Sequence, residues 1–171
     1  MKLVLELPTP TDTERLGRAV GARLRAGDVV VLSGPLGAGK TVLVRGIGAG
    51  LGVRGPITSP TFVIAREHPP LPEGRGVPLV HVDAYRLGGH PELDDLDLDT
   101  DLLAAAVVVE WGEGLAERLA DEHLLIRLAR SGAGGDGDRD DSRVAQLSGP
   151  DRLIPEPACL TVTRQPEMSH P

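Results

Sequence analysis

The chain has 171 residues, of which 40% are hydrophobic, and a formal net charge of −7 at pH 7. This length suits one α/β domain with a buried core and argues against a second full domain. The acidic balance argues against a protein that binds nucleic acid by itself, because neutralising phosphates requires clustered Lys and Arg. The single Cys159 excludes an intramolecular disulfide and a zinc site made of cysteines alone.

The first residues do not resemble a secretory signal. Residues 3–7 alternate in polarity and then meet Pro8, whereas a signal contains an apolar stretch of about 7–15 residues. No part of the sequence approaches the roughly 18 consecutive apolar residues of a membrane-spanning helix. We therefore expect a soluble, cytoplasmic protein.

The N-terminal segment is predicted to alternate strands and helices. Residues 3–7 form a short strand, and Thr11 or Asp12 caps the helix that follows, which ends at Gly27. Residues 28–32 form a buried strand. The apolar residues of the predicted helix recur at helical spacing: Leu16, Ala19, Val20, Ala22 and Leu24.

A second helix is expected to begin at Lys40. Its sequence contains Gly46, Gly48, Gly50 and Gly52, and each glycine costs up to about 1 kcal/mol relative to alanine inside a helix. We therefore expect fraying among these glycines, which packing must compensate.

Between this strand and this helix lies the segment 34–41, Gly-Pro-Leu-Gly-Ala-Gly-Lys-Thr. It matches the phosphate-binding loop G-x-x-x-x-G-K-[ST] in its strand-to-helix context. Glycines let the backbone point several N–H groups at one phosphate chain, and the helix N-terminus adds partial positive charge. Lys40 would reach the β- and γ-phosphates of a nucleoside triphosphate, and Thr41 would give its hydroxyl to Mg²⁺. The residues expected to contact the nucleotide are Leu36, Gly37, Ala38, Gly39, Lys40 and Thr41.

Two later apolar runs each end in a carboxylate. Residues 79–82 lead into Asp83, and residues 104–109 lead into Glu110. Strands of a buried, mostly parallel sheet deliver acids in this way to the carboxyl edge, where ligands bind. We therefore expect both acids near the phosphate loop.

The remaining segments complete the predicted order of elements. Residues 61–65 form another strand, residues 69–78 form a loop because they contain four prolines and two glycines, and residues 115–119 form a short helix. The last two strands span 123–128 and 143–147. We expect a mobile Gly/Asp-rich loop over 131–142, since such a sequence buries too little apolar surface to order itself.

These elements predict an α/β fold. It is a P-loop NTPase-like three-layer sandwich with a mostly parallel central sheet and an antiparallel C-terminal strand pair. One ATPase domain is expected over residues 1–149, followed by an irregular, proline-rich tail over 150–171.

Four motifs in sequence resemble the TsaE (YjeE) ATPases of bacterial tRNA threonylcarbamoyladenosine synthesis. They are the loop 34–41, Thr58-Ser-Pro-Thr-Phe62, His81-Val-Asp-Ala-Tyr-Arg-Leu87 and Val109-Glu-Trp111, and the resemblance covers roughly residues 3–130. It implies a slow, partner-regulated ATPase that uses ATP and Mg²⁺. Such a protein joins a TsaB–TsaD pair, which installs N6-threonylcarbamoyl on adenosine 37 of tRNAs reading codons that begin with A. The partners would supply most of the tRNA-binding surface.

The resemblance also suggests roles for individual residues. Glu110 matches a magnesium-linked acid that would hold the metal with Thr41; its alternative is a carboxylate paired with a loop cation. Asp83 would orient the attacking water, or be purely structural. Trp111 would pack beside the nucleotide or fill core space. Thr11 belongs to the segment 10–13, which in the family lies against adenine.

Two interpretations remain open for each of three further sequence features. His81 is more often a buried, hydrogen-bonded histidine than a ligand. Residues 58–61 form either a segment that senses the γ-phosphate or an ordinary Ser-Pro turn. Arg86 is either a catalytic arginine or an ion-pair partner for nearby acids.

The phosphate loop is also compatible with two other functions. One is a small P-loop kinase, which requires a second substrate pocket with a lid and consumes ATP only when an acceptor is present. The other is a nucleotide-dependent protein-binding module whose hydrolysis is incidental.

Overall fold

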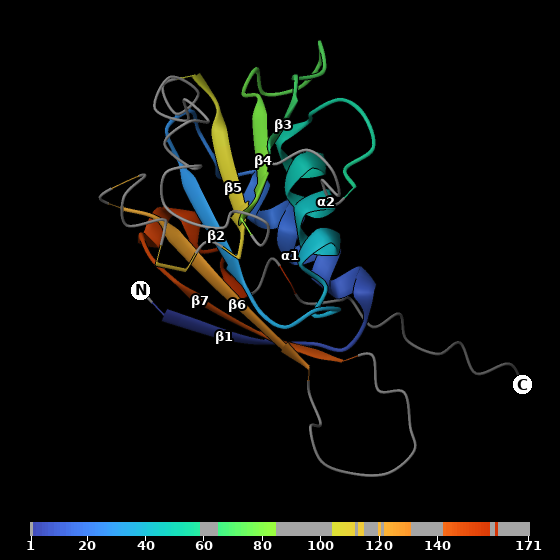
Figure 1. Cartoon of the computed structure of the whole chain (residues 1–171), viewed down its shortest axis with the longest axis vertical. Coiled ribbons are helices and arrows are strands. Elements are labelled where there is room, and N and C mark those ends of the chain that lie inside the picture. Colours follow the sequence, from blue (N-terminus) through green and yellow to red (C-terminus); the bar gives the residue numbers. More distant parts are fainter. Residues whose placement is uncertain are drawn as a thin grey trace, which may run out of the picture.

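The computed structural model describes residues 2–58, 65–84, 104–111, 113–114, 120, 122–130, 142–157 and 160. Within these residues seven strands form one sheet, in the order β1-β7-β6-β2-β5-β4-β3 (Figure 1). Strands β6, β2, β5 and β4 run parallel to one another, while the pairs β1–β7, β7–β6 and β4–β3 are antiparallel. The strands are β1 (Lys2–Leu7), β2 (Val29–Ser33), β3 (Ala65–His68), β4 (Leu79–Asp83), β5 (Ala106–Glu110), β6 (Leu124–Arg130) and β7 (Arg143–Ser148).

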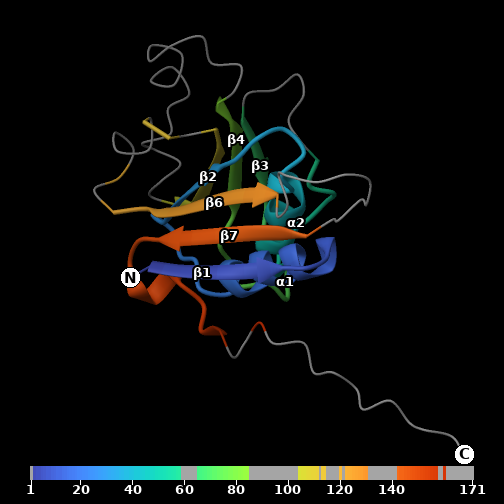
Figure 2. The same cartoon turned by 90° about the horizontal axis from the view of Figure 1, so that it is seen from below.

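This sheet confirms the predicted α/β class, with its parallel centre and its antiparallel pair of C-terminal strands, β6 and β7. Each strand lies within a few residues of its predicted position, except β3, whose predicted residues 61–64 lie outside the described residues. Figure 2 shows β6, β7 and β1 side by side, with the first strand of the chain at the sheet edge. The first strand thus pairs with the last, a contact that local sequence patterns do not predict.

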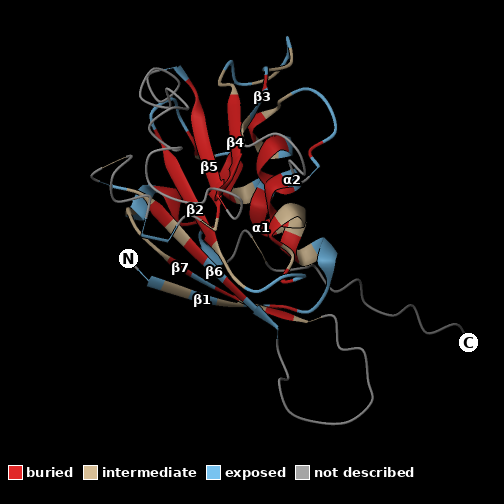
Figure 3. Cartoon of the chain, in the orientation of Figure 1, coloured by how far each residue is buried: buried red, intermediate tan, exposed pale blue. Residues whose placement is uncertain are grey.

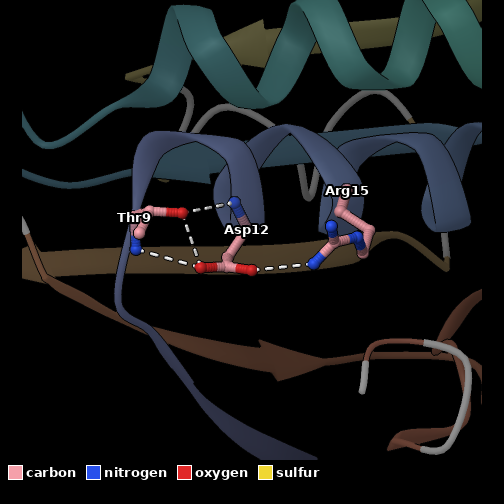
Figure 4. Close-up of polar contacts among 3 residues, drawn as sticks. All are labelled: Thr9, Asp12 and Arg15. Carbon is pink, nitrogen blue, oxygen red and sulfur yellow. Dashed lines mark hydrogen bonds and ion pairs between the residues drawn. The ribbon is translucent and has the colours of Figure 1, made fainter. Parts of the chain in front are cut away.

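Helix α1 (Pro10–Gly21) begins two or three residues earlier than predicted. Thr9, rather than Thr11 or Asp12, is the N-cap: its hydroxyl accepts a hydrogen bond from Asp12 N at 3.2 Å, and Asp12 Oδ2 accepts one from Thr9 N at 3.0 Å (Figure 4). Asp12 also accepts a bond from Arg15 at 2.8 Å. This reciprocal capping box satisfies two helix-terminal donors, and Pro10 occupies a position where its missing N–H is harmless.

The same helix ends before the predicted Gly27. Its last residue is Gly21, and the Arg75 guanidinium donates hydrogen bonds to the carbonyls of Gly21 and Leu24 at 3.1 and 2.9 Å. A side chain from the loop between β3 and β4 therefore satisfies carbonyls at this end, which an isolated helix leaves unpaired.

Helix α2 (Lys40–Leu51) is unbroken, so the expected fraying is wrong. Its glycines are points of close approach to α1: a Cβ on Gly46 would lie 2.1 Å from the Glu14 carbonyl oxygen. Conversely, a Cβ on Gly17 of α1 would lie 2.2 Å from the Leu43 carbonyl oxygen. The two helices therefore pack backbone against backbone, and this packing offsets the low helix propensity of glycine. Gly52, with φ of 74°, ends α2 as a left-handed cap.

The α-helices α1 and α2 lie on one face of the sheet (Figure 1). Their apolar residues, such as Leu16 and Ile47, share a core cluster with the sheet residues Val30 and Val108. The alternate residues of the same strands form a second buried cluster on the opposite face, and the central strands are buried along their length (Figure 3). Central strands buried on both faces are what a layered sandwich requires. The predicted helix over 115–119 and most of the loop 131–142 lie outside the described residues.

The described part of the C-terminal segment packs against the core. A short 3-10 helix, η3 (Asp151–Leu153), buries Leu153, and Ile154 is buried beside it. Arg152 forms a bidentate ion pair with the buried Asp28, at 2.5 and 2.9 Å. The predicted division of the chain at residue 149 stays a prediction.

Candidate nucleotide-binding site

The loop between β2 and α2 has the backbone shape that its glycines predict. Gly34, Gly37 and Gly39 have φ angles of 147°, 75° and 100°, a region that residues with a side chain rarely adopt. A Cβ on Gly34 would lie 2.4 Å from the Leu128 carbonyl oxygen, so this position also lacks space. The loop thus ends in Gly39, which serves as the N-cap of α2.

Lys40 folds back onto this loop. Its Nζ donates hydrogen bonds to the carbonyl oxygens of Gly34 and Pro35 at 2.7 and 3.0 Å, and it lies 3.8 Å from the centroid of the Trp111 ring. Burial lowers the pKa of Lys40 below its ordinary value, and the nearby Glu110 and Asp83 carboxylates partly oppose this shift. A buried cation whose contacts among the described residues are carbonyl oxygens and an aromatic ring is suited to exchange these contacts for phosphate oxygens.

The two predicted acids end neighbouring strands. Asp83 and Glu110 are register partners across β4 and β5, and Glu110 also lies opposite Leu32 of β2, at the strand end where the phosphate loop begins. Both acids are buried. The structure therefore brings them to one edge beside Lys40, as the strand pattern predicts.

His81 fixes the Glu110 carboxylate. The fully buried His81 has Nε2 at 2.9 Å from Glu110 Oε1, a distance at which the protonated ring nitrogen donates a hydrogen bond to the carboxylate oxygen. This contact confirms the interpretation of His81 as a buried, hydrogen-bonded histidine. A carboxylate anchored through one oxygen resembles a metal ligand oriented by a supporting partner.

Trp111 follows Glu110 in a left-handed conformation, with φ of 63°. Its backbone N donates to the Leu32 carbonyl oxygen at 2.8 Å, and its half-buried ring faces the Lys40 ammonium group. A bulky residue with positive φ is strained, and such strain occurs preferentially at functional sites. The ring thus lies beside Lys40 at the start of α2, and its predicted packing against the nucleotide stays a prediction.

A cavity of about 290 Å³ opens at this loop. Lys40, Thr41 and Glu110 line it together, and the hydroxyl and carboxylate oxygens among them are the ligands that Mg²⁺ prefers. Its lining residues are Pro10, Thr13, Gly37, Gly39, Lys40, Thr41, Val42, Glu110 and Arg143.

The described residues that line the cavity do not include Leu36, Ala38 and Thr11, which are also predicted to contact the nucleotide. Leu36 is 90% exposed, and Ala38 is fully buried within the loop. Thr11 is exposed on α1, whereas its neighbours Pro10 and Thr13 line the cavity. The predicted segment 10–13 thus contributes Pro10 and Thr13 to the cavity wall. A contact between Thr11 and the nucleotide stays a prediction.

One residue that the sequence analysis missed is Arg143, at the start of β7. Its Nε donates to the carbonyl oxygen of Ala38, 105 residues earlier in the chain, at 3.2 Å. No motif contains this arginine, and only the pairing of β7 beside β6 brings it to the loop.

Comparison with known proteins identifies the family. The family model described as "Threonylcarbamoyl adenosine biosynthesis protein TsaE" matches residues 7–139. The chain belongs to the TsaE family. This membership confirms the resemblance carried by the four motifs.

Several proteins named tRNA threonylcarbamoyladenosine biosynthesis protein TsaE are similar to this chain. The protein from Mycobacterium bovis is 62% identical over 130 residues, covering 72% of this chain and 77% of the relative. The Streptomyces coelicolor protein is 62% identical over 117 residues, covering 68% and 78%. The Bacillus subtilis protein is 38% identical over 125 residues, covering 72% and 75%.

A solved structure supports the fold assignment. The crystal structure of Bacillus subtilis YdiB superimposes with a TM-score of 0.66 at 30% sequence identity, covering 87% of this chain and 86% of that one. Among the described residues of the TsaE-family chain, no helix combines the length and apolar character needed to cross a membrane.

Proposed function

We propose that this TsaE-family chain is a cytoplasmic, Mg²⁺-dependent ATPase that hydrolyses ATP to ADP and phosphate. It assists TsaB-like and TsaD-like proteins in forming N6-threonylcarbamoyladenosine at position 37 of tRNAs that read codons beginning with A. The family and the names of its members support the pathway. With a net charge of −7, the chain reaches tRNA through its partners rather than alone.

One observation carries the ATPase proposal. Lys40, Thr41 and Glu110 line a single cavity at a phosphate loop whose glycines have the required backbone angles. A glycine-rich turn that binds nothing needs neither a buried lysine nor a carboxylate beside it. Polar groups converging in one cavity are the usual mark of a ligand site.

Each side chain has a distinct part in the proposed reaction. Bound Mg²⁺–ATP supplies a γ-phosphate activated by the charge of the metal. Lys40 balances phosphate charge, while Thr41 and Glu110 offer oxygens to the metal. Asp83 orients the attacking water, because this reaction needs positioning and charge balance more than a strong base.

Calorimetric titration with ATP and Mg²⁺ tests the site. Lys40→Ala should abolish tight binding, because the triphosphate charge is then undercompensated. Thr41→Ala should weaken binding more with Mg²⁺ than with EDTA. Lys2→Ala, at an exposed position of β1, is the matched control and should bind ATP as the wild type does. Unchanged affinity in folded Lys40→Ala would reject the site.

Hydrolysis assays test the acids. Glu110→Gln and Asp83→Asn should each lower the rate at least about 10²-fold, the scale of losing one positioned group. Thermal melts of both variants must show folded protein. Wild-type rates in both would reject the assignment.

A pull-down with and without ATP–Mg²⁺ tests the proposed partners. The bound fraction is scored for TsaB-like proteins, TsaD-like proteins and tRNA. ATP consumption that appears only with an added acceptor would favour a kinase instead. Equal tRNA modification with a non-hydrolysable ATP analogue would favour a nucleotide-dependent binding module.

A further inference from the structure

Arg143 is the second cation in the wall of the nucleotide cavity, beside Lys40. Arg143 is only 9% exposed to solvent. The bond from its Nε to the Ala38 carbonyl oxygen fixes the guanidinium against the phosphate loop, and Nη1 donates to the Ser142 carbonyl oxygen at 3.1 Å. Burying a guanidinium is costly unless it is paired or hydrogen-bonded, and these two hydrogen bonds hold the charged group in the cavity wall.

The sheet order puts this arginine opposite the proposed metal site. Strand β2, which leads into the phosphate loop, has β5 on one side and β6 followed by β7 on the other. Glu110 ends β5 and Arg143 begins β7, on opposite sides of β2 in the sheet, and both residues line the cavity. A triphosphate whose β- and γ-phosphates lie near Thr41 and Glu110 therefore directs its α-phosphate toward Arg143.

A neighbouring arginine adds positive charge on this side. Arg130, the last residue of β6, is the register partner of Arg143. Its Nη2 would lie 3.1 Å from a Cβ built on Gly37, so the guanidinium lies against the loop. Among the described residues that line the cavity, Glu110 is the one carboxylate, beside the two cations Lys40 and Arg143, and this balance favours an anionic ligand.

We propose that Arg143 contacts the α-phosphate of the bound nucleotide, an inference that rests on the proposed ATP binding. Guanidinium groups bind phosphate through short, charge-assisted hydrogen bonds. Arg143 lies beyond residues 7–139, the part of the chain that the family model matches.

Calorimetric titration of Arg143→Gln with ADP and with ATP tests the inference. Because both nucleotides carry an α-phosphate, the variant should bind each about 10- to 100-fold more weakly, with an unchanged ratio of the two affinities. Wild-type affinity should also fall more steeply with salt than that of the variant, which has one cationic contact fewer. Arg18→Gln, at an exposed position of α1, is the matched control and should match the wild type in both respects.

The outcomes separate the inference from the proposed function. A loss for ATP but not for ADP would place Arg143 on the γ-phosphate and overturn the inference. Unchanged affinity, or a loss with an unchanged salt dependence, would reduce Arg143 to shaping the loop and would also overturn it. If the wild type binds neither nucleotide, the proposed function fails as well.

A measurement on the wild type keeps the test valid if Arg143→Gln does not fold. The Arg143 Nε–Hε resonance, assigned by through-bond correlation to its backbone, should shift when ADP is added, while that of Arg18 should not. An unchanged Arg143 resonance at saturating ADP would overturn the inference.

Discussion

The Lys40 ammonium group is held by two carbonyl oxygens and an aromatic ring, and among the described residues no carboxylate forms an ion pair with it. In this environment desolvation outweighs the attraction of Glu110 and Asp83, and the pKa of Lys40 is lowered. The bound phosphates would reverse this balance.

The lowered pKa of Lys40 can be measured by NMR titration. The chain contains two lysines, Lys2 and Lys40, so ¹³Cε NMR yields two signals, and Lys2→Arg identifies them. The pKa of Lys40 should lie below its ordinary value of 10.5 without nucleotide, and rise when ADP is added because phosphate stabilises the ammonium form. A ligand-free pKa at or above 10.5, or no rise with ADP, would contradict this.

The sign for stability follows from the same shift. A lysine whose pKa is lower in the folded than in the unfolded state makes the folded state bind fewer protons in the interval between the two values. The free energy of unfolding contributed by Lys40 therefore increases as the pH rises from its folded-state pKa toward 10.5. Lys40→Met should lack this contribution.

The His81–Glu110 hydrogen bond predicts a coupled loss of stability. His81→Leu leaves the 3%-exposed Glu110 without this donor, and the free energy of unfolding should fall by about 2 kcal/mol or more. The double variant with Glu110→Met should lose less than the sum of the single variants, because the unpaired charge is then gone. Urea denaturation measures all three; strictly additive losses would show that the contact is energetically inert.

At the scale of elements, the α1–α2 interface depends on glycines that helix propensity disfavours. Propensity alone predicts that Gly46→Ala stabilises α2 by up to about 1 kcal/mol. The structure predicts the opposite, because the new Cβ would lie 2.1 Å from the Glu14 carbonyl oxygen. Forcing the helices apart should lower the free energy of unfolding by about 1–3 kcal/mol.

Gly48→Ala is the matched control in the same helix. Its Cβ would meet Ile57 Cδ1, the end of a flexible side chain that can move aside. Urea denaturation should therefore show a much smaller loss, or a gain, for Gly48→Ala than for Gly46→Ala. Equal effects would mean that the helices do not pack as closely as described.

At the scale of the whole molecule, the described start of the C-terminal segment joins the fold rather than trailing from it. Leu153 and Ile154 are buried, and Arg152 pairs with Asp28, which lies just before β2. This contact links residues 124 positions apart in the chain. We therefore expect η3 to contribute to the stability of the whole domain.

Thermal and urea unfolding test this expectation. Leu153→Ala should lower the free energy of unfolding by about 2–4 kcal/mol, the usual cost of a cavity at a buried leucine. Truncation after Gly149 should lower it further, since Ile154 and the Asp28 partner are also lost. Glu156→Ala, at an exposed position, should change it by less than about 0.5 kcal/mol. A truncated chain as stable as the full one would refute the role of η3.

The sequence by itself determined the elements that local chemistry specifies. Residues 34–41 predicted a phosphate loop, and the runs ending in Asp83 and Glu110 predicted parallel strands with acids at one edge, because glycine content, apolar runs and strand direction act over short distances. These patterns predicted that Lys40, Thr41 and Glu110 lie together, and the three residues line one cavity. The four motifs likewise indicated the TsaE family.

Tertiary structure decided what depends on contacts between distant segments. Only the sheet order brings Arg143 to Ala38 and pairs β1 with β7. Only the approach of α1 explains why α2 tolerates Gly46. Thr9 displaced Thr11 and Asp12 as the cap because Asp12 serves as the reciprocal partner inside the first turn. The free energy of such contacts comes from burial and hydrogen bonds across the fold, which local propensity and spacing do not encode.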